Sequence, residues 1–146
     1  MRIQFIFTDT SITLSNKKKL KLFIEKTFKQ KGRKLTSLAI IFCTDEYLLD
    51  INRRFLQHDY YTDIITFNLA GSTNTIEGEI YISVDRIKEN AFCNKVSKKE
   101  ELHRVIFHGV LHLCGFNDKS KADKKLMTHM EDNVLRSYFL GMEPAH

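Results

Sequence analysis

Apolar and polar residues recur along this chain with two different spacings, which divide it into strands and helices. Alternation with a period of two, or a short apolar run, predicts strands over residues 2–8, 38–43, 63–69 and 79–84. Apolar residues spaced three or four apart, with polar caps before them, predict helices over 15–31, 44–55, 85–94, 97–113 and 120–140. Neither repeats nor low-complexity linkers interrupt this order.

The mixed order of elements predicts an α+β fold. About five helices are expected to pack on one small mixed sheet of about four strands. The strands at 63–69 and 79–84 flank a Gly-Ser-Thr-Asn loop and are predicted to form a long hairpin. With 146 residues, the chain is long enough for one substantial core. We therefore expect a single domain, residues 1–146, with its functional site at the end of a central helix.

A pair of histidines distinguishes the fourth predicted helix. His108 and His112 are four residues apart and lie side by side at the edge of the apolar stripe, whereas His103 lies on the opposite flank. Gly115 is expected to end the helix in a left-handed turn, which lets Asp118 approach both imidazoles. Three protein ligands and one open position predict a catalytic metal site. The stripe itself consists of Leu102, Val105, Ile106, Val110 and Leu113.

Other interpretations of this motif make different predictions. Metallopeptidases of the HExxH kind have a Glu directly after the first His as general base, and Gly109 occupies that position, which disfavours peptidase chemistry. Cys114 faces about 200° away from His112 on the helical wheel and is excluded as a ligand. Asp118 could instead cap the following helix, in which case Asn would serve as well as Asp.

The string from His108 to Asp118, His-Gly-x-Leu-His-Leu-x-Gly-aromatic-x-Asp, resembles the signature of the YbeY family of bacterial metal-dependent endoribonucleases. Residues 49–67 and 78–83 resemble two further segments of that family, in the same order. The family usually has a third His at the position of Asp118 and an Arg at the position of Leu56. Carboxylate is an acceptable zinc ligand, so the first departure is compatible with a metal site.

The resemblance implies an endoribonuclease that prefers single strands and acts in ribosomal RNA maturation and ribosome quality control. Its implied partners are RNA and the ribosome or ribosomal proteins, with neither DNA nor membrane. His108, His112 and Asp118 would hold one Zn²⁺, although Ni²⁺ or another divalent metal also suits imidazole ligands. Arg54 and His58 are the candidate catalytic groups, because they could supply the charge that the chain lacks at Leu56.

The net charge of +5 and the isoelectric point near 9.1 favour an acidic partner. Basic residues flank the metal motif, and a positive rim around a metal site fits a polyanionic substrate. The candidate RNA contacts are Arg53, Lys119, Lys121 and Lys124.

Three isolated Cys residues favour buried free thiols in a reducing compartment. No apolar run approaches the ~20 residues of a membrane span, and the first apolar segment is too short for a signal peptide. These features favour a cytoplasmic protein.

Two other classes of function remain open from the sequence. One is a metallohydrolase that acts on peptides or small molecules, because the two-histidine helix resembles the metal helix of metallopeptidases. The other is a non-enzymatic, ribosome-associated RNA-binding module in which a metal only braces the fold. Leu56, in place of the Arg usual in the resembling family, is compatible with this second alternative.

Overall fold

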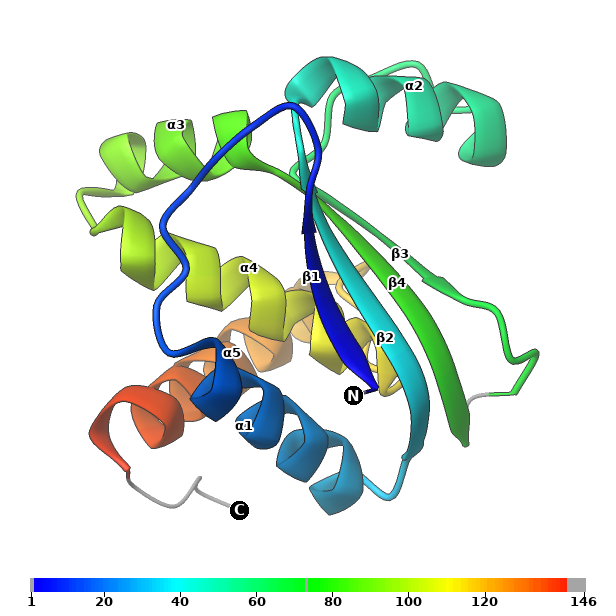
Figure 1. Ribbon diagram of the computed structural model, residues 1–146, viewed down its shortest axis with the longest axis vertical. Coiled ribbons are helices and arrows are strands. Elements are labelled where there is room, and N and C mark those ends of the chain that lie inside the picture. Colours follow the sequence, from blue (N-terminus) through cyan, green and yellow to red (C-terminus); the bar gives the residue numbers. More distant parts are fainter. Residues whose placement is uncertain (1, 73, 142–146) are drawn as a thin grey trace.

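The computed structural model describes residues 2–72 and 74–141 (Figure 1). Within them the chain forms four strands and five helices, as the sequence predicted. In chain order they are β1 (Ile3–Phe7), α1 (Lys17–Gln30), β2 (Lys34–Cys43), α2 (Asp45–Leu56), β3 (Ile64–Asn68), β4 (Thr75–Ser83), α3 (Val84–Asn94), α4 (Lys98–Leu113) and α5 (Lys121–Leu140).

The four strands form one mixed sheet in the order β1-β2-β4-β3. β2 pairs in parallel with both β1 and β4, whereas β3 and β4 are antiparallel neighbours, which confirms the predicted hairpin. Side chains alternate between the two faces, so Ile80 and Ile82 join the main core while Tyr81 points to the other side. The predicted α+β fold is therefore confirmed.

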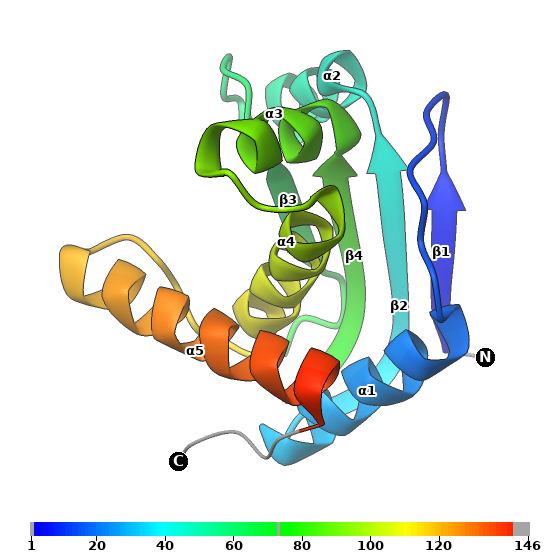
Figure 2. The ribbon, with the colours of Figure 1, turned by 90° about the vertical axis from the view of Figure 1, so that its left-hand side faces the viewer.

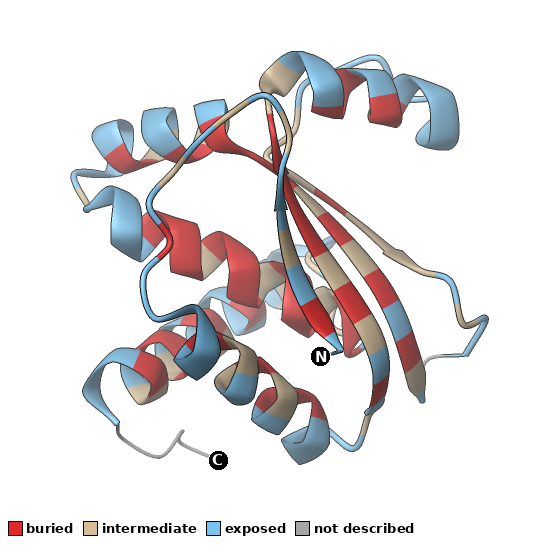
Figure 3. Cartoon of the chain, in the orientation of Figure 1, coloured by how far each residue is buried: buried red, intermediate tan, exposed pale blue. Residues whose placement is uncertain are grey.

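Helices cover the two faces of the sheet unequally. Figures 1 and 2 show α1, α3, α4 and α5 on one face and α2 on the other. The main core lies under the four helices, and burial is most continuous along α4 and the strands that it contacts (Figure 3). A smaller cluster of Cys43, Leu48, Ile51 and Ile65 joins α2 to the opposite face. None of the helices in the described part of the chain has the length and hydropathy that crossing a membrane requires.

Several predicted boundaries and one predicted burial were wrong. β2 and β4 begin four residues earlier than predicted, because Lys34 pairs with Thr75 at the start of a parallel ladder whose polar residues face solvent. α1 begins at Lys17, two residues later than predicted, because Asn16 before it adopts a left-handed conformation. Cys93 is exposed, because it lies on the outer side of α3, whereas Cys43 and Cys114 are buried.

Gly109 allows α4 to lie directly against the β3–β4 hairpin. A Cβ atom at this position would lie 2.9 Å from Ile64 Cδ1 and 3.0 Å from both Ile80 Cδ1 and Ile80 Cγ2. These distances are shorter than van der Waals contact, so the position accepts only hydrogen without repacking. Gly109, which occupies the position of the catalytic Glu in HExxH peptidases, therefore serves to pack α4 against the sheet.

Gly109→Val is expected to lower the free energy of unfolding by about 1–3 kcal/mol, because the added methyl groups overpack the interface with Ile64 and Ile80. Helix propensity alone predicts the opposite sign, since Gly is the poorest helix former after Pro. Urea unfolding followed by circular dichroism measures the difference. A variant as stable as the parent, or more stable, would show that α4 has room to move away from the sheet.

Candidate metal centre

After its exposed first turn, α4 is buried at all but three positions. From Glu101 to Leu113 every residue of α4 is buried except Arg104, His108 and His112. These three are spaced four apart and so lie on one line along the helix. Ser97 caps the N-terminus of α4, because its hydroxyl accepts a hydrogen bond from the backbone N–H of Glu100.

The turn after α4 brings the chain back over the end of the helix. Gly115 has a φ of +101°, a conformation that L side chains rarely adopt, and its N–H donates to the His112 carbonyl. Arg33 fixes this turn from outside, because its Nε and Nη2 donate to the Cys114 carbonyl at 3.1 and 2.8 Å. The predicted return at Gly115 is thus confirmed, and it leads to Asp118.

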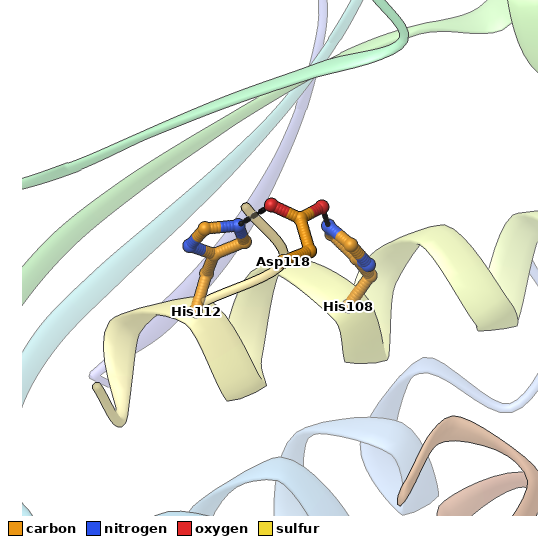
Figure 4. A group of neighbouring side chains, drawn as sticks. All are labelled: His108, His112 and Asp118. Carbon is orange, nitrogen blue, oxygen red and sulfur yellow. Dashed lines mark ion pairs between the residues drawn. The ribbon is translucent and has the colours of Figure 1, made fainter. Parts of the chain in front are cut away.

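His108, His112 and Asp118 converge on one point beside α4 (Figure 4). His108 Nε2 lies 3.3 Å from Asp118 Oδ2, and His112 Nε2 lies 3.4 Å from Asp118 Oδ1. One donor atom from each residue lies within 4.8 Å of the other two. Donor atoms around a tetrahedral zinc ion are about 3.4 Å apart when each bond is about 2.1 Å long. The donor set and its spacing therefore fit a metal ion.

A buried carboxylate orients the first histidine. His108 Nδ1 contacts Glu131 Oε2 at 2.5 Å, and Glu131 Oε1 accepts from Arg104 Nη1 at 3.0 Å. Since an ionised carboxylate only accepts hydrogen bonds, Nδ1 of the neutral ring carries the proton and Nε2 presents its lone pair toward Asp118. A carboxylate behind the ligand in this way is the usual support of metal-binding histidines.

Acidic groups around His108 favour a positive charge at this point. Burial lowers the pKa of His108, but the hydrogen bond and charge of Glu131, with the charges of Asp118 and Asp63, outweigh it and leave the pKa raised. Burial also raises the pKa of Asp63, which precedes β3, and the charge of His108 opposes that shift. The same carboxylates that stabilise a protonated imidazole would stabilise a bound cation.

Sequence reasoning missed Glu131 and gave Asp63 no role. Glu131 is buried, and it lies within the apolar stripe by which α5 packs on the core. A carboxylate inside such a stripe is a signal that could have found it, because burying an unpaired charge is costly. The stripe consists of Met127, Glu131, Val134, Leu135 and Tyr138.

The proposed alternative role of Asp118 as a helix cap does not match the structure. Ser120 caps α5, and its side chain accepts from the backbone N–H of Asp123 at 3.0 Å. The Asp123 carboxylate in turn accepts from the Ser120 N–H at 3.4 Å, which completes a capping box without Asp118. Cys114 is buried in the main core, in agreement with its exclusion as a ligand.

The residues predicted on and after α2 make local contacts. Arg53 pairs with Asp59, Arg54 with Asp50 at 3.3 Å, and His58 Nδ1 with the Tyr60 hydroxyl at 3.0 Å. Within residues 2–72 and 74–141, none of these three forms a hydrogen bond or ion pair with the histidines of α4 or with Asp118. Catalytic roles for Arg54 and His58, and an RNA contact by Arg53, therefore stay predictions.

Two of the three predicted lysines line a hollow beside α5. Lys121 and Lys124, with Lys125 and His129, border a hollow of about 830 Å³ that also includes Asp132. Asp132 accepts from Arg104 Nη2 at 2.6 Å, and the same guanidinium binds Glu131. The hollow therefore adjoins the side chains that support His108. Lys119 is exposed in the preceding turn, and contact of these lysines with RNA stays a prediction.

Known proteins resemble this chain over most of its length. The family model of endoribonuclease YbeY matches residues 4–139. The endoribonuclease YbeY of Cytophaga hutchinsonii is 45% identical over 133 residues, which cover 91% of this chain and 93% of that protein. The one from Parabacteroides distasonis is 41% identical over 135 residues, which cover 92% and 94% respectively.

A comparison of structures gives the same fold. The solution structure of TM1509 from Thermotoga maritima aligns with a TM-score of 0.64 over 95% of this chain and 90% of that one. Its sequence is 24% identical, so the likeness concerns the fold alone. The family match and the identity to curated relatives extend over nearly all of the chain, which therefore belongs to the endoribonuclease YbeY family.

Proposed function

We propose that the protein is a metal-dependent endoribonuclease in which His108, His112 and Asp118 hold one divalent ion, Zn²⁺ or another metal such as Ni²⁺. The observation that carries the proposal is the convergence of these three donors, with His108 oriented by a buried carboxylate, in a chain of the YbeY family. We further propose that it prefers single-stranded RNA and acts in the cytoplasm on ribosomal RNA, in its maturation and in ribosome quality control.

The ion and the side chains around it have different roles in the proposed reaction. When bound, the ion would supply a Lewis acid that polarises a phosphoryl oxygen and lowers the pKa of a water molecule. Glu131 keeps the His108 Nε2 lone pair pointed inward, and Arg104 holds Glu131 in place. Lys121 and Lys124 line the neighbouring hollow, where ammonium groups can hold phosphates without reading the base sequence.

Two observations weigh against the other classes of function. Gly109 packs against Ile64 and Ile80, so α4 has no general base after its first histidine, which disfavours a peptidase of the HExxH kind. A metal that only braces the fold is usually closed in by four protein ligands. Here the side chains of His112 and Asp118 are 31% and 39% exposed, which leaves a substrate access to the site.

The proposal is tested by loading the chelator-treated protein separately with Zn²⁺, Ni²⁺ and Mn²⁺. Each form is then incubated with a single-stranded RNA, with a fully paired RNA of the same length, and with casein. We expect internal cuts in RNA, fastest in the single strand, and intact casein. Cleavage of casein but not RNA would favour the peptide hydrolase, and intact RNA with every metal would favour the non-enzymatic RNA-binding module.

A series at Asp118 tests the third ligand. Asp118→Ala and Asp118→Asn are both expected to weaken metal affinity at least ~10-fold, the lower end of what losing a supporting residue costs at a metal site. Asp118→His should retain the affinity, because imidazole is also a zinc ligand and the family usually has a His at this position. Isothermal titration with Zn²⁺ measures all four proteins. Wild-type affinity in Asp118→Asn would remove Asp118 from the ligand set.

A further inference from the structure

The positive charge of the chain is concentrated on α1 and the turn that follows it. Residues 17–34 contain eight lysines and one arginine against a single acid, Glu25. The net charge of this segment, +8, exceeds the +5 of the whole chain, so the remaining residues together are net negative. The basic residues nearest the metal motif in sequence are therefore not the main source of positive charge.

Part of this charge surrounds a hollow between the outer side of α1 and the beginning of β2. The hollow has a volume of about 550 Å³. It is lined by five cationic residues, Arg2, Lys26, Lys29, Arg33 and Lys34, and by one carboxylate, Glu25. A concave surface with this excess of cations attracts anions more strongly than the same charges spread over a convex one.

The lysines of the hollow have ammonium groups available for a ligand. In the part of the chain that the structure describes, the cation of every ion pair is an arginine or a histidine. Lys26, Lys29 and Lys34 are exposed. The two arginines of the hollow instead brace the backbone, since Arg2 Nη1 donates to the Leu35 carbonyl at 3.1 Å and Arg33 binds the Cys114 carbonyl.

The basic surface continues to the loop that supplies the third metal ligand. Arg33 lines the hollow and also holds the Cys114 carbonyl, four residues before Asp118. Lys31 Nζ lies 5.6 Å above the ring of Phe116, two residues before Asp118. Figure 2 shows α1 and α5 crossing at the base of the molecule, next to each other. Arg33 and Lys31 therefore connect the basic segment 17–34 to the loop that carries Asp118.

We propose that the hollow of Lys26, Lys29 and Lys34 binds the phosphodiester backbone of an RNA strand whose cleaved bond lies at the metal centre. The proposal rests on the endoribonuclease function proposed above and adds a docking surface on α1. A flexible polyanion matches several lysines arranged along a helix and its following strand, because each ammonium can neutralise one phosphate regardless of sequence.

An anionic membrane fits the charge of α1 but not its apolar residues. The apolar side of α1 is turned into the main core, where Leu20, Ile24 and Phe28 are fully buried. Leu22 is the one apolar residue of α1 that is more than half exposed, at 53%. Helices that bind in the plane of a membrane require a continuous apolar face for insertion. RNA is therefore the ligand that these residues favour.

The test compares two double charge reversals on the same helix. Lys26→Glu/Lys29→Glu changes the hollow, and Lys17→Glu/Lys18→Glu makes the same change of charge at the other end of α1. Binding of fluorescent single-stranded RNAs of about 4 and about 16 nucleotides, which span the range of known site sizes, is measured in chelator between 50 and 200 mM salt. Vesicles with 30% phosphatidylserine are a third probe, and circular dichroism checks the fold.

We expect Lys26→Glu/Lys29→Glu to lower the affinity for the longer RNA at least 10-fold. Its log–log salt slope should become shallower by about 1.4, which corresponds to two lost phosphate contacts. The control should lose less than 3-fold, and the short RNA should distinguish the two variants less than the long one does. Equal losses in both variants, no loss in either, or a loss confined to vesicles would each overturn the proposal.

The outcomes separate this proposal from the proposed function. Wild-type protein that cuts RNA, with unchanged RNA binding in Lys26→Glu/Lys29→Glu, overturns the docking surface and leaves the endoribonuclease function intact. Wild-type protein that binds RNA through the hollow but cuts none under any metal condition overturns the function and supports the surface.

Discussion

Replacing His112 with alanine is expected to remove the bound metal and RNA cleavage together while the fold remains intact. His112 Nε2 faces Asp118, and its side chain lies at the half-exposed edge of α4, so truncation leaves no cavity in the core. Losing one of three protein ligands should lower metal affinity at least ~100-fold, which exceeds the usual effect of losing a supporting residue. Elemental analysis of chelator-free preparations and RNA cleavage under saturating metal measure the two effects.

Two further variants, His129→Ala and His108→Ala, serve as controls for His112→Ala. His129→Ala removes an exposed histidine of α5 and should retain its metal content. His108→Ala should lose the metal as well, but it should also unfold more easily, because Glu131 would lose the contact to His108 Nδ1 while remaining buried. Equal metal content in wild type and His112→Ala would show that any ion binds elsewhere.

Glu131→Gln is expected to lower metal affinity by about 10–100-fold, although Glu131 is not a metal ligand in this arrangement. The charge of Glu131 holds the proton on His108 Nδ1 and so keeps the Nε2 lone pair directed at Asp118. Gln keeps the shape but loses the charge, whereas Glu131→Ala also leaves Arg104 with fewer partners and should cost a further ~2–3 kcal/mol of stability. Metal titration and urea unfolding separate the two effects.

Asp132→Asn is the matched control for this prediction. Asp132 binds the same guanidinium as Glu131, at 2.6 Å from Arg104 Nη2, but its side chain is 49% exposed and does not contact His108. Its substitution should leave metal affinity within about 3-fold of wild type, since exposed ion pairs contribute little. If Glu131→Ala binds metal as tightly as wild type, orientation of His108 by Glu131 has no part in the site.

The parts of the site that the sequence predicted are those specified by local spacing. His108 and His112 share one helix, and Gly115 turns the chain within three residues of Asp118, so no distant packing is needed to place them together. Glu131 could not be placed in this way. It lies on another helix, and its contact with His108 depends on how α5 crosses α4. Its burial within an apolar stripe was the one available signal.

Contacts between distant segments also limited what the sequence predicts about the fold. The beginnings of β2 and β4 are rich in polar residues and become strands because they pair with each other, with Lys34 opposite Thr75. Arg33 joins the turn after α1 to the Cys114 carbonyl, 81 positions away in the chain. This contact places the basic turn after α1 next to the metal-site loop, whereas proximity in the sequence pointed to the lysines after Asp118.

The most direct test of the metal centre is anomalous diffraction from crystals grown with zinc, recorded on both sides of the zinc absorption edge. We predict one strong anomalous peak per chain within bonding distance of His108 Nε2, His112 Nε2 and an Asp118 carboxylate oxygen, with His108 Nδ1 still in contact with Glu131. An anomalous map with no peak between these three side chains, or with its only peak at other residues, would contradict a metal centre at the end of α4.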